Sequence, residues 1–207
     1  NSSTSSKVLA RALLIGVVLF LGYLFSNKYF KEQKENDYVL YYESGKQHQE
    51  YKNYQDAIND YNKCINIYPD RDSIIALQAQ CYYEKGAYQA AIDNYIKAIY
   101  MASGMNADYF AGRGKSYSKL RKHYNAQIDF EKAISMKADN AGYHLLKGND
   151  FWIQGKYNSA EKNYTKSLSI KADAVAYYKR GNANYKLGEL ADAIKDYTNA
   201  IIWNSSY

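Results

Sequence analysis

The stretch that decides the fold is Tyr54-Gln-Asp-Ala-Ile-Asn-Asp-Tyr-Asn-Lys-Cys-Ile65. It returns 34 residues later as Tyr88-Gln-Ala-Ala-Ile-Asp-Asn-Tyr-Ile-Lys-Ala-Ile99. The same alanine, followed four positions later by an aromatic residue, recurs as Ala126/Phe130, Ala160/Tyr164 and Ala193/Tyr197. A spacing of three to four residues predicts amphipathic helices, and a period near 34 indicates an array of similar units.

A second series of small residues lies upstream of the first, at Gly45, Ala79, Gly114, Gly148 and Gly181. Each unit is therefore predicted to hold two amphipathic helices of about twelve to fifteen residues with a short turn between them. Small residues on both helices are expected to let the helices of one hairpin approach closely. The bulky residues are expected to fill the seam against the next unit; they are Tyr61, Tyr95, Phe130, Tyr164 and Tyr197.

The composition agrees with an all-α chain. One proline in 207 residues leaves long helices possible almost everywhere, and 47% hydrophobic residues exclude a disordered chain. The two cysteines, Cys64 and Cys81, lack the spacing of a disulfide framework or a zinc site, so we expect small buried residues. The 25 tyrosines suit half-buried seams and binding surfaces.

These recurring positions resemble the tetratricopeptide repeat (TPR) family over five units: 38–71, 72–106, 107–140, 141–173 and 174–207. The resemblance implies a right-handed α-solenoid of five helical hairpins, whose first helices line a concave groove for peptides or other protein segments. Most members of the family are scaffolds without chemistry of their own. The pattern departs from the family at His123, where an aromatic residue is expected at the turn.

Co-chaperone members of the family hold a chaperone's C-terminal carboxylate with a set of lysine, asparagine and basic residues. The matching positions here fail, being Tyr42, Lys46, Leu77, Asp108 and Gly112. The resemblance therefore disfavours a receptor for chaperone tails.

The N-terminal region differs from the repeats. After a polar tail at 1–7, residues 8–25 are apolar except for Arg11 and would span about 27 Å as a helix. This predicts a single transmembrane helix, followed by a helical stalk at 26–37; a signal peptide and a buried helix are the alternatives. The expectation is a single-pass membrane protein, with a mitochondrial membrane favoured over a bacterial inner membrane. The flanking charges leave the orientation open.

The expected groove contains lysines beside aromatic and apolar residues, which are common anchors of interfaces. The candidate partner-binding residues are Tyr42, Lys46, Tyr83, Lys115, Lys119, Asn149, Trp152, Ile153, Tyr178, Asn182 and Tyr185. A basic patch is formed by Arg113, Lys115, Lys119, Arg121 and Lys122. A solvated charged face and a site for an acidic peptide, a C-terminus or a lipid head group are the two interpretations of this patch.

Other kinds of site are disfavoured. The run Gly112-Arg-Gly-Lys-Ser116 resembles part of a phosphate loop, but Tyr109 stands at the first glycine and the segment lies in a predicted helix. His48, His123 and His144 lack the spacing of metal ligands. We therefore expect no catalytic residues, metal, cofactor, nucleotide or nucleic-acid partner.

The sequence favours a membrane-anchored protein-protein interaction scaffold, most simply an accessory or assembly subunit of a larger membrane complex. A receptor for transient protein or peptide clients, as in mitochondrial import, is the alternative. The targeting arm or regulatory subunit of an enzyme is a weaker alternative. The last unit exposes the hydrophobic seam around Tyr197 and Ile201 unless further residues or a partner cover it.

Overall fold

The structure, a computed structural model, describes residues 2–204, and their side chains from residue 14 onward. Within that range the chain forms ten helices. They are α1 (Ser2–Glu50), α2 (Tyr54–Ile67), α3 (Asp72–Glu84), α4 (Tyr88–Met101), α5 (Ala107–Lys119), α6 (His123–Met136), α7 (Ala141–Ile153), α8 (Tyr157–Ile170), α9 (Ala174–Leu187) and α10 (Leu190–Asn204).

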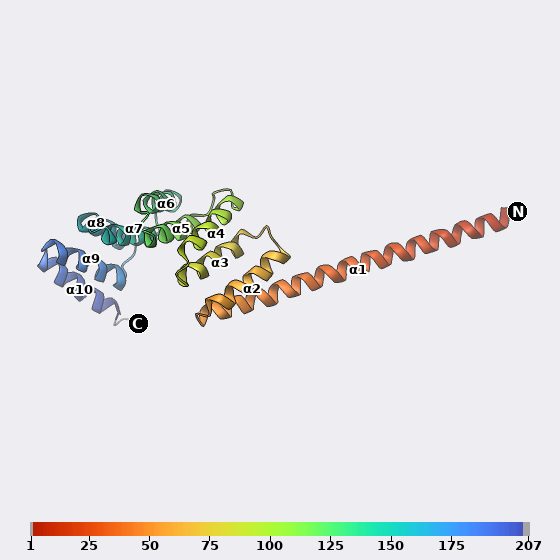
Figure 1. Ribbon diagram of the computed structural model, residues 1–207, viewed down its shortest axis with the longest axis horizontal. Helices are drawn as coiled ribbons and strands as arrows, with labels where there is room; N and C mark the ends of the chain where they lie inside the picture. The colour runs from red at the N-terminus through yellow and green to blue at the C-terminus, as the bar shows by residue number, and fades with distance from the viewer. Residues whose placement is uncertain (1, 205–207) are drawn as a thin grey trace.

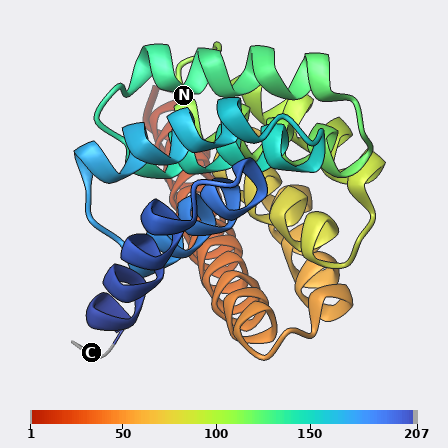
Figure 2. The same ribbon diagram turned by 90° about the vertical axis from the view of Figure 1, so that its left-hand side faces the viewer.

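The helices pair into five hairpins that follow one another along a curved array (Figure 1). The last turns of α1 pair with α2, and the later hairpins are α3–α4, α5–α6, α7–α8 and α9–α10. Viewed from the end of the array, the α9–α10 hairpin faces the reader and the array winds away behind it (Figure 2). The prediction of an all-helical repeat solenoid is confirmed.

Local sequence signals set the ends of the helices. The side chains of Asn106, Asn140 and Asp173 accept hydrogen bonds from backbone N–H groups and so cap the first helices α5, α7 and α9. The turn inside each hairpin needs a residue with positive φ. Glycine supplies it at Gly86, Gly155 and Gly188, but Lys52 and Arg121 adopt it in the first and third hairpins, at φ of 61° and 58°.

The inside of each hairpin depends on a small residue facing an aromatic ring. A Cβ atom added to Gly148 would lie 2.6 Å from Cε1 of Tyr164, and one on Gly181 would lie 2.8 Å from Cε1 of Tyr197. The predicted close approach of the two helices is therefore confirmed. The rings do not all lie between units, however: Tyr61, Phe130, Tyr164 and Tyr197 pack against the glycine of their own hairpin. Tyr95, whose hairpin has Ala79 instead, lies against Gly112 of the next unit, as predicted.

The N-terminal prediction is wrong. Among the residues whose placement is described, no helix combines the length and the apolarity needed to cross a bilayer. The proposed transmembrane helix at 8–25 and the single-pass membrane protein, mitochondrial or bacterial, are thus contradicted; the side chains of 8–13 lie outside the described residues.

Instead, α1 is one helix of 49 residues. It includes the expected stalk at 26–37 and continues without a break into the first helix of the first hairpin. Figure 1 shows its N-terminal part projecting away from the repeat array.

The expectation for the cysteines is confirmed. Cys64 and Cys81 are fully buried and unpaired. Burial raises the pKa of the Cys64 thiol to about 11 and that of Cys81 to about 12, so both remain protonated at neutral pH. They act as small core residues between the first two hairpins.

Candidate functional site

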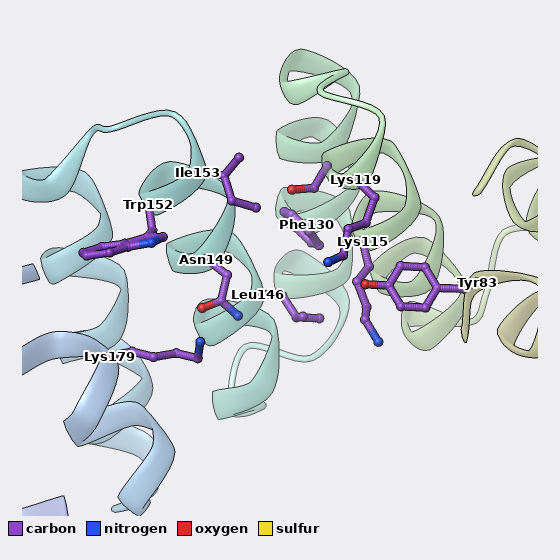
Figure 3. A pocket seen from close by; sticks show the side chains of 10 residues that line it. Tyr83, Lys115, Lys119, Phe130, Leu146, Asn149, Trp152, Ile153 and Lys179 are labelled. Carbon is purple, nitrogen blue, oxygen red and sulfur yellow. The ribbon is translucent and has the colours of Figure 1, made fainter. Parts of the chain in front are cut away.

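The first helices of neighbouring hairpins line a cavity of about 250 Å³. Six of the eleven predicted groove residues meet there: Tyr83, Lys115, Lys119, Asn149, Trp152 and Ile153. Figure 3 shows them on successive helices, with Tyr83 and Trp152 at opposite sides. Four further lining residues were missed by the sequence reasoning, namely Ser118, Phe130, Leu146 and Lys179.

The repeat explains why these side chains share one surface. Lys115 and Asn149 each follow the small residue of their first helix by one position, and Lys119 and Ile153 follow it by five. Positions four apart lie on the same face of a helix, so equivalent residues from stacked units line up side by side. The same alignment of repeats could have predicted that Lys179 lines the groove, because it stands at the repeat position of Leu146.

The lysines of the cavity differ in their partners. The Lys115 ammonium lies 3.7 Å from Oε1 of Glu84 and 4.1 Å from the centroid of the Tyr83 ring. Burial raises the pKa of Tyr83 to about 12, so this ring remains a neutral phenol at neutral pH. Within the described part of the chain, Lys119 and Lys179 make no ion pair or side-chain hydrogen bond. These two charges are therefore available to an anionic partner.

An apolar surface lies between those lysines. Trp152 packs against Tyr157 with ring centroids 5.0 Å apart, which holds the indole in place, and Ile153 and Leu146 lie beside it. Asn149 accepts a hydrogen bond from the Tyr164 hydroxyl at 3.1 Å, which leaves its amide nitrogen free to donate. The cavity thus offers an apolar contact flanked by positive charge and one amide donor.

A second cavity of about 420 Å³ continues the groove and shares Tyr83, Lys115 and Leu146 with the first. Its floor carries Asp108, which accepts a hydrogen bond from the Tyr143 hydroxyl at 2.6 Å. That hydrogen bond, assisted by Lys137, holds the pKa of Asp108 below its ordinary value of 3.8. The second cavity therefore carries one carboxylate, paired with Lys137, beside Lys115.

The other five predicted groove residues do not line this first cavity, the one of about 250 Å³. Tyr42 stacks on Tyr38 at 6.0 Å between ring centroids, and Lys46 lies 5.2 Å from the Tyr42 centroid. Asn182 accepts a hydrogen bond from the Tyr197 hydroxyl at 2.9 Å. Tyr178 and Tyr185 are exposed on α9, and Tyr178 lines a separate hollow described below.

The five residues of the basic patch do not form one surface. Arg113 makes a two-pronged ion pair with the buried Asp129, with distances of 2.7 and 2.8 Å, and this pairing raises the pKa of the guanidinium. Lys122 donates to Oε1 of Gln89 at 3.3 Å, and Arg121 occupies the positive-φ turn. Only Lys115 and Lys119 of the patch line the groove cavity.

Comparison with known families supports the repeats directly. Tetratricopeptide repeat family models match residues 38–71, 107–140 and 174–207. A curated human protein, sperm-associated antigen 1, is 29% identical over 92 residues, which is 44% of this chain. The chain spans about a tenth of that protein's length.

Solved structures share the fold at low sequence identity. The pilF protein of Pseudomonas aeruginosa matches with a TM-score of 0.71 at 17% identity, over 82% of this chain and 77% of that one. A MamA structure from Desulfovibrio magneticus matches with a TM-score of 0.69 at 12% identity, over 82% and 96%. A thermophilic TPR protein of Thermus thermophilus matches with a TM-score of 0.67 at 16% identity, over 82% and 91%.

Proteins with these repeats bind other proteins or peptides, and the fold is typically a non-enzymatic scaffold. The repeat positions, the hairpin geometry and the matches agree. The chain carries tetratricopeptide repeats in an all-helical TPR-like solenoid, a fold that suggests a protein-protein interaction scaffold.

Proposed function

We propose that the chain is a protein-protein interaction scaffold whose groove binds an acidic segment of a partner protein. The observation that carries the proposal is the pair Lys119 and Lys179, which have no partner among the described residues and flank an apolar surface. No acidic side chain is among the described residues that line this cavity. A ligand with a carboxylate next to a bulky apolar side chain satisfies both features.

The scaffold has two possible uses. As an accessory or assembly subunit it stays bound to other protein subunits, and as a receptor it releases its clients. The long stacked array gives a stable surface for permanent association, so we place the subunit role first. Native mass spectrometry of the purified complex separates the two, because a subunit retains its partners in fixed stoichiometry.

The groove is tested by reversing the charge of the two unpaired lysines in a Lys119→Glu/Lys179→Glu variant. Random peptides displayed on phage are selected on the wild-type chain, and the affinity of one enriched peptide is measured by fluorescence anisotropy. We expect acidic peptides with Trp, Phe or Leu to be enriched, and their affinity to fall at least about tenfold in the variant. Raising the salt concentration from about 0.1 to about 0.5 M should weaken binding to the wild type.

The matched control is Lys132→Glu/Lys162→Glu, which makes the same charge change on the second helices α6 and α8, away from the groove cavity. It should bind the selected peptide as the wild type does. An equal loss of affinity in both variants would show that the net charge of the chain, and not the groove, governs peptide binding. Enrichment of neutral or basic peptides would contradict the proposal.

A further inference from the structure

A polar cavity of about 330 Å³ lies at the junction of the fourth and fifth hairpins, where α8 meets α9 and α10 (Figure 1). It shares no lining residue with the groove cavity. It is also separate from the hollow of about 460 Å³ that Tyr178 lines with Tyr197 and Ile201, which is apolar. We call the polar cavity the junction pocket.

One buried acceptor of the junction pocket has no partner. Asn184, which lines the pocket, is 4% exposed, and its amide nitrogen donates to Oδ2 of Asp196 at 3.1 Å. This bond fixes the orientation of the amide, because a flipped amide would place Oδ1 against the carboxylate. Across residues 14–204, Oδ1 of Asn184 is the one buried side-chain oxygen or nitrogen atom without a hydrogen bond. An unsatisfied buried acceptor is costly, so the pocket calls for a donor.

The repeat shows that apolar side chains stand elsewhere at the positions that line this pocket. Four equivalent positions at the junction of the second and third hairpins hold Ile92, Ile96, Arg113 and Tyr117. In the junction pocket they hold Glu161, Thr165, Arg180 and Asn184. The arginine is kept, and the three other side chains become polar. The position of Asn184 is aromatic in all three middle hairpins, as Tyr82, Tyr117 and Phe151.

The arginine of the pocket is already occupied. Arg180 donates to the two carboxylate oxygens of Asp196 at 2.7 and 2.9 Å, and to the Thr165 hydroxyl at 3.0 Å. The equivalent Arg113 makes the same pair with Asp129 in the third hairpin, and its guanidinium carbon lies 5.9 Å from the centroid of the Tyr117 ring. The Arg–Asp pair is therefore part of the repeat, and the remaining charges of the pocket decide what it can bind.

Those remaining charges are mainly negative. Glu161, Glu189 and Asp192 line the pocket together with one lysine, Lys195. Glu161 accepts one hydrogen bond, from the Thr165 hydroxyl at 2.7 Å. As far as the structure describes the chain, the other three side chains make no ion pair or side-chain hydrogen bond. The pocket thus combines an unsatisfied oxygen with an excess of carboxylate, which favours a cationic donor.

The distribution of the acceptors suits an extended organic cation. In the described range, no group of three or more acidic, histidine or cysteine side chains is arranged to hold a metal ion. The acceptors are contributed by three helices and by Glu189, which directly precedes α10. A guanidinium group spreads five N–H donors over a plane and is less strongly hydrated than an ammonium group, so it can serve several separated acceptors.

We propose that the junction pocket binds the guanidinium group of an arginine on a partner protein. Oδ1 of Asn184 accepts one of its N–H donors, and the carboxylates of Glu161 and Asp192 supply the opposite charge. The site is independent of the groove. A protein as the source of the arginine rests on the proposed scaffold function, whereas the preference for a guanidinium rests on the pocket alone.

The preference is tested by NMR on the full chain, with the backbone amides of Glu189 and Asp192 as reporters. The probe is N-acetyl-arginine amide, and N-acetyl-lysine amide is the control of equal charge. We expect saturable shifts with the arginine compound, with a dissociation constant of about 1–10 mM, and at least about threefold weaker binding of the lysine compound. No saturable shift, or equal binding of the two compounds, would overturn the proposal.

Two variants tie the binding to the pocket. Glu161→Gln/Asp192→Asn removes two of the charges and should weaken binding of the arginine compound at least about tenfold. The matched control Asp56→Asn/Asp93→Asn makes the same charge change at exposed positions of α2 and α4, and should bind as the wild type does. Equal loss in both variants would assign the binding to net charge and overturn the proposal.

The second variant, Asn184→Tyr, restores the ring that the middle hairpins carry. It should fold, because Arg113 and Asp129 keep their pair beside Tyr117, and circular dichroism checks this. We expect it to abolish the shifts at Glu189 and Asp192. Binding as tight as in the wild type would show that Oδ1 of Asn184 takes no part.

Phage display distinguishes a protein segment from a free small cation as the ligand. Random peptides are selected in parallel on the wild type and on Asn184→Tyr. We expect arginine-containing peptides to be enriched on the wild type and not on the variant, whereas acidic peptides that use the groove should be enriched on both. Loss of the acidic class alone would count against the groove. Absence of an arginine class that depends on Asn184 would overturn a protein ligand for the junction pocket.

Discussion

The odd and the even hairpins use the same repeat position in opposite ways. In hairpins one, three and five, the residue before the small residue of the first helix bonds an aspartate on the second helix of the same hairpin. The pairs are Ser44–Asp60 at 2.6 Å, and Arg113–Asp129 and Arg180–Asp196, both at 2.7 Å for their shorter distances. In the even hairpins the equivalent residue reaches back: Gln78 donates to Asn62 at 2.7 Å and Lys147 to Glu131 at 3.0 Å.

The second helix decides between the two arrangements. The odd hairpins have Asp60, Asp129 and Asp196 before the aromatic ring, whereas the even ones have asparagine. Asn94 and Asn163 donate to carbonyl groups of their own helices, at 2.9 and 2.8 Å. Being uncharged, they offer the first helix no carboxylate to pair with. At this repeat position, odd hairpins are thus bonded internally, and even hairpins are bonded to the unit before them. The family models match the three odd units.

The largest expected effect is the loss of an odd hairpin's carboxylate. Asp129→Ala leaves the mostly buried Arg113 guanidinium without its counter-ion, and we expect about 3–5 kcal/mol of lost unfolding free energy. The equivalent change in an even hairpin, Asn163→Ala, should cost about 1 kcal/mol or less. Urea unfolding followed by circular dichroism measures both. Equal losses would remove the distinction between the two kinds of hairpin.

The second prediction concerns the one hairpin with alanine at the small position. Beside Ala79, the Tyr95 ring lies against Gly112 of the next hairpin, and a Cβ there would overlap the ring. Gly112→Ala should therefore cost about 1–3 kcal/mol. Ala79→Gly in the same chain should recover part of the loss by giving the ring space in its own hairpin. Strict additivity in the double-mutant cycle would show that the two positions do not share the ring.

The third prediction tests how an even hairpin is fastened to the unit before it. Tyr143→Phe removes the hydrogen bond to Asp108, and we expect a loss of about 1 kcal/mol at pH 7. The bond lowers the folded-state pKa of Asp108, so its contribution is present above the ordinary value of 3.8 and is lost as the pH falls through the folded-state value. The stability difference from the wild type should accordingly shrink below about pH 4. Tyr124→Phe, at an exposed tyrosine, is the control, and a difference independent of pH would argue against the assignment.

The smallest expected effect is at Lys147→Met. Its partner Glu131 is exposed, so the ion pair should contribute about 0.5 kcal/mol, and less in about 1 M salt. Thermal unfolding at low and high salt measures this contribution. A loss as large as that of Asp129→Ala would contradict the view that the Lys147–Glu131 pair is a weak, exposed contact.

Much of the fold was predictable because the repeat period reports directly on which residues face which helix. The small positions Gly148 and Gly181 were assigned to close contacts from spacing alone, and the contacts are present. For the same reason, six of the predicted groove residues line one cavity. The bonding partners of single side chains were harder to predict. Arg113 was assigned to a basic patch, although the aspartate that neutralises it, Asp129, stands 16 residues later. The recurring aspartate before the aromatic ring was the signal that revealed such pairs.

The N-terminal error has a different origin. Apolar composition at 8–25 predicts that a helix avoids water, but it does not say what covers the helix. Among the described residues, no helix combines the length and the apolarity needed to cross a bilayer, and the apolar stretch belongs to a helix that continues, with polar residues, into the repeats. The exposure of the apolar seam of the last hairpin, in contrast, was predicted from the repeats, and Ile201 is 70% exposed.

The unbroken α1 helix fixes the orientation of the repeat array around the helix axis, relative to the N-terminal half of α1. A 49-residue helix extends about 74 Å and turns about 100° with each residue, so the direction in which the groove opens is set by the N-terminal half of the helix. One residue inserted between Lys31 and Glu35 would swing the whole repeat array by about 100° around the helix axis while moving it only about 1.5 Å. Seven inserted residues would bring it back to within about 20° of its original heading. The number of residues in α1 therefore determines which way the groove faces relative to the N-terminal half of the helix.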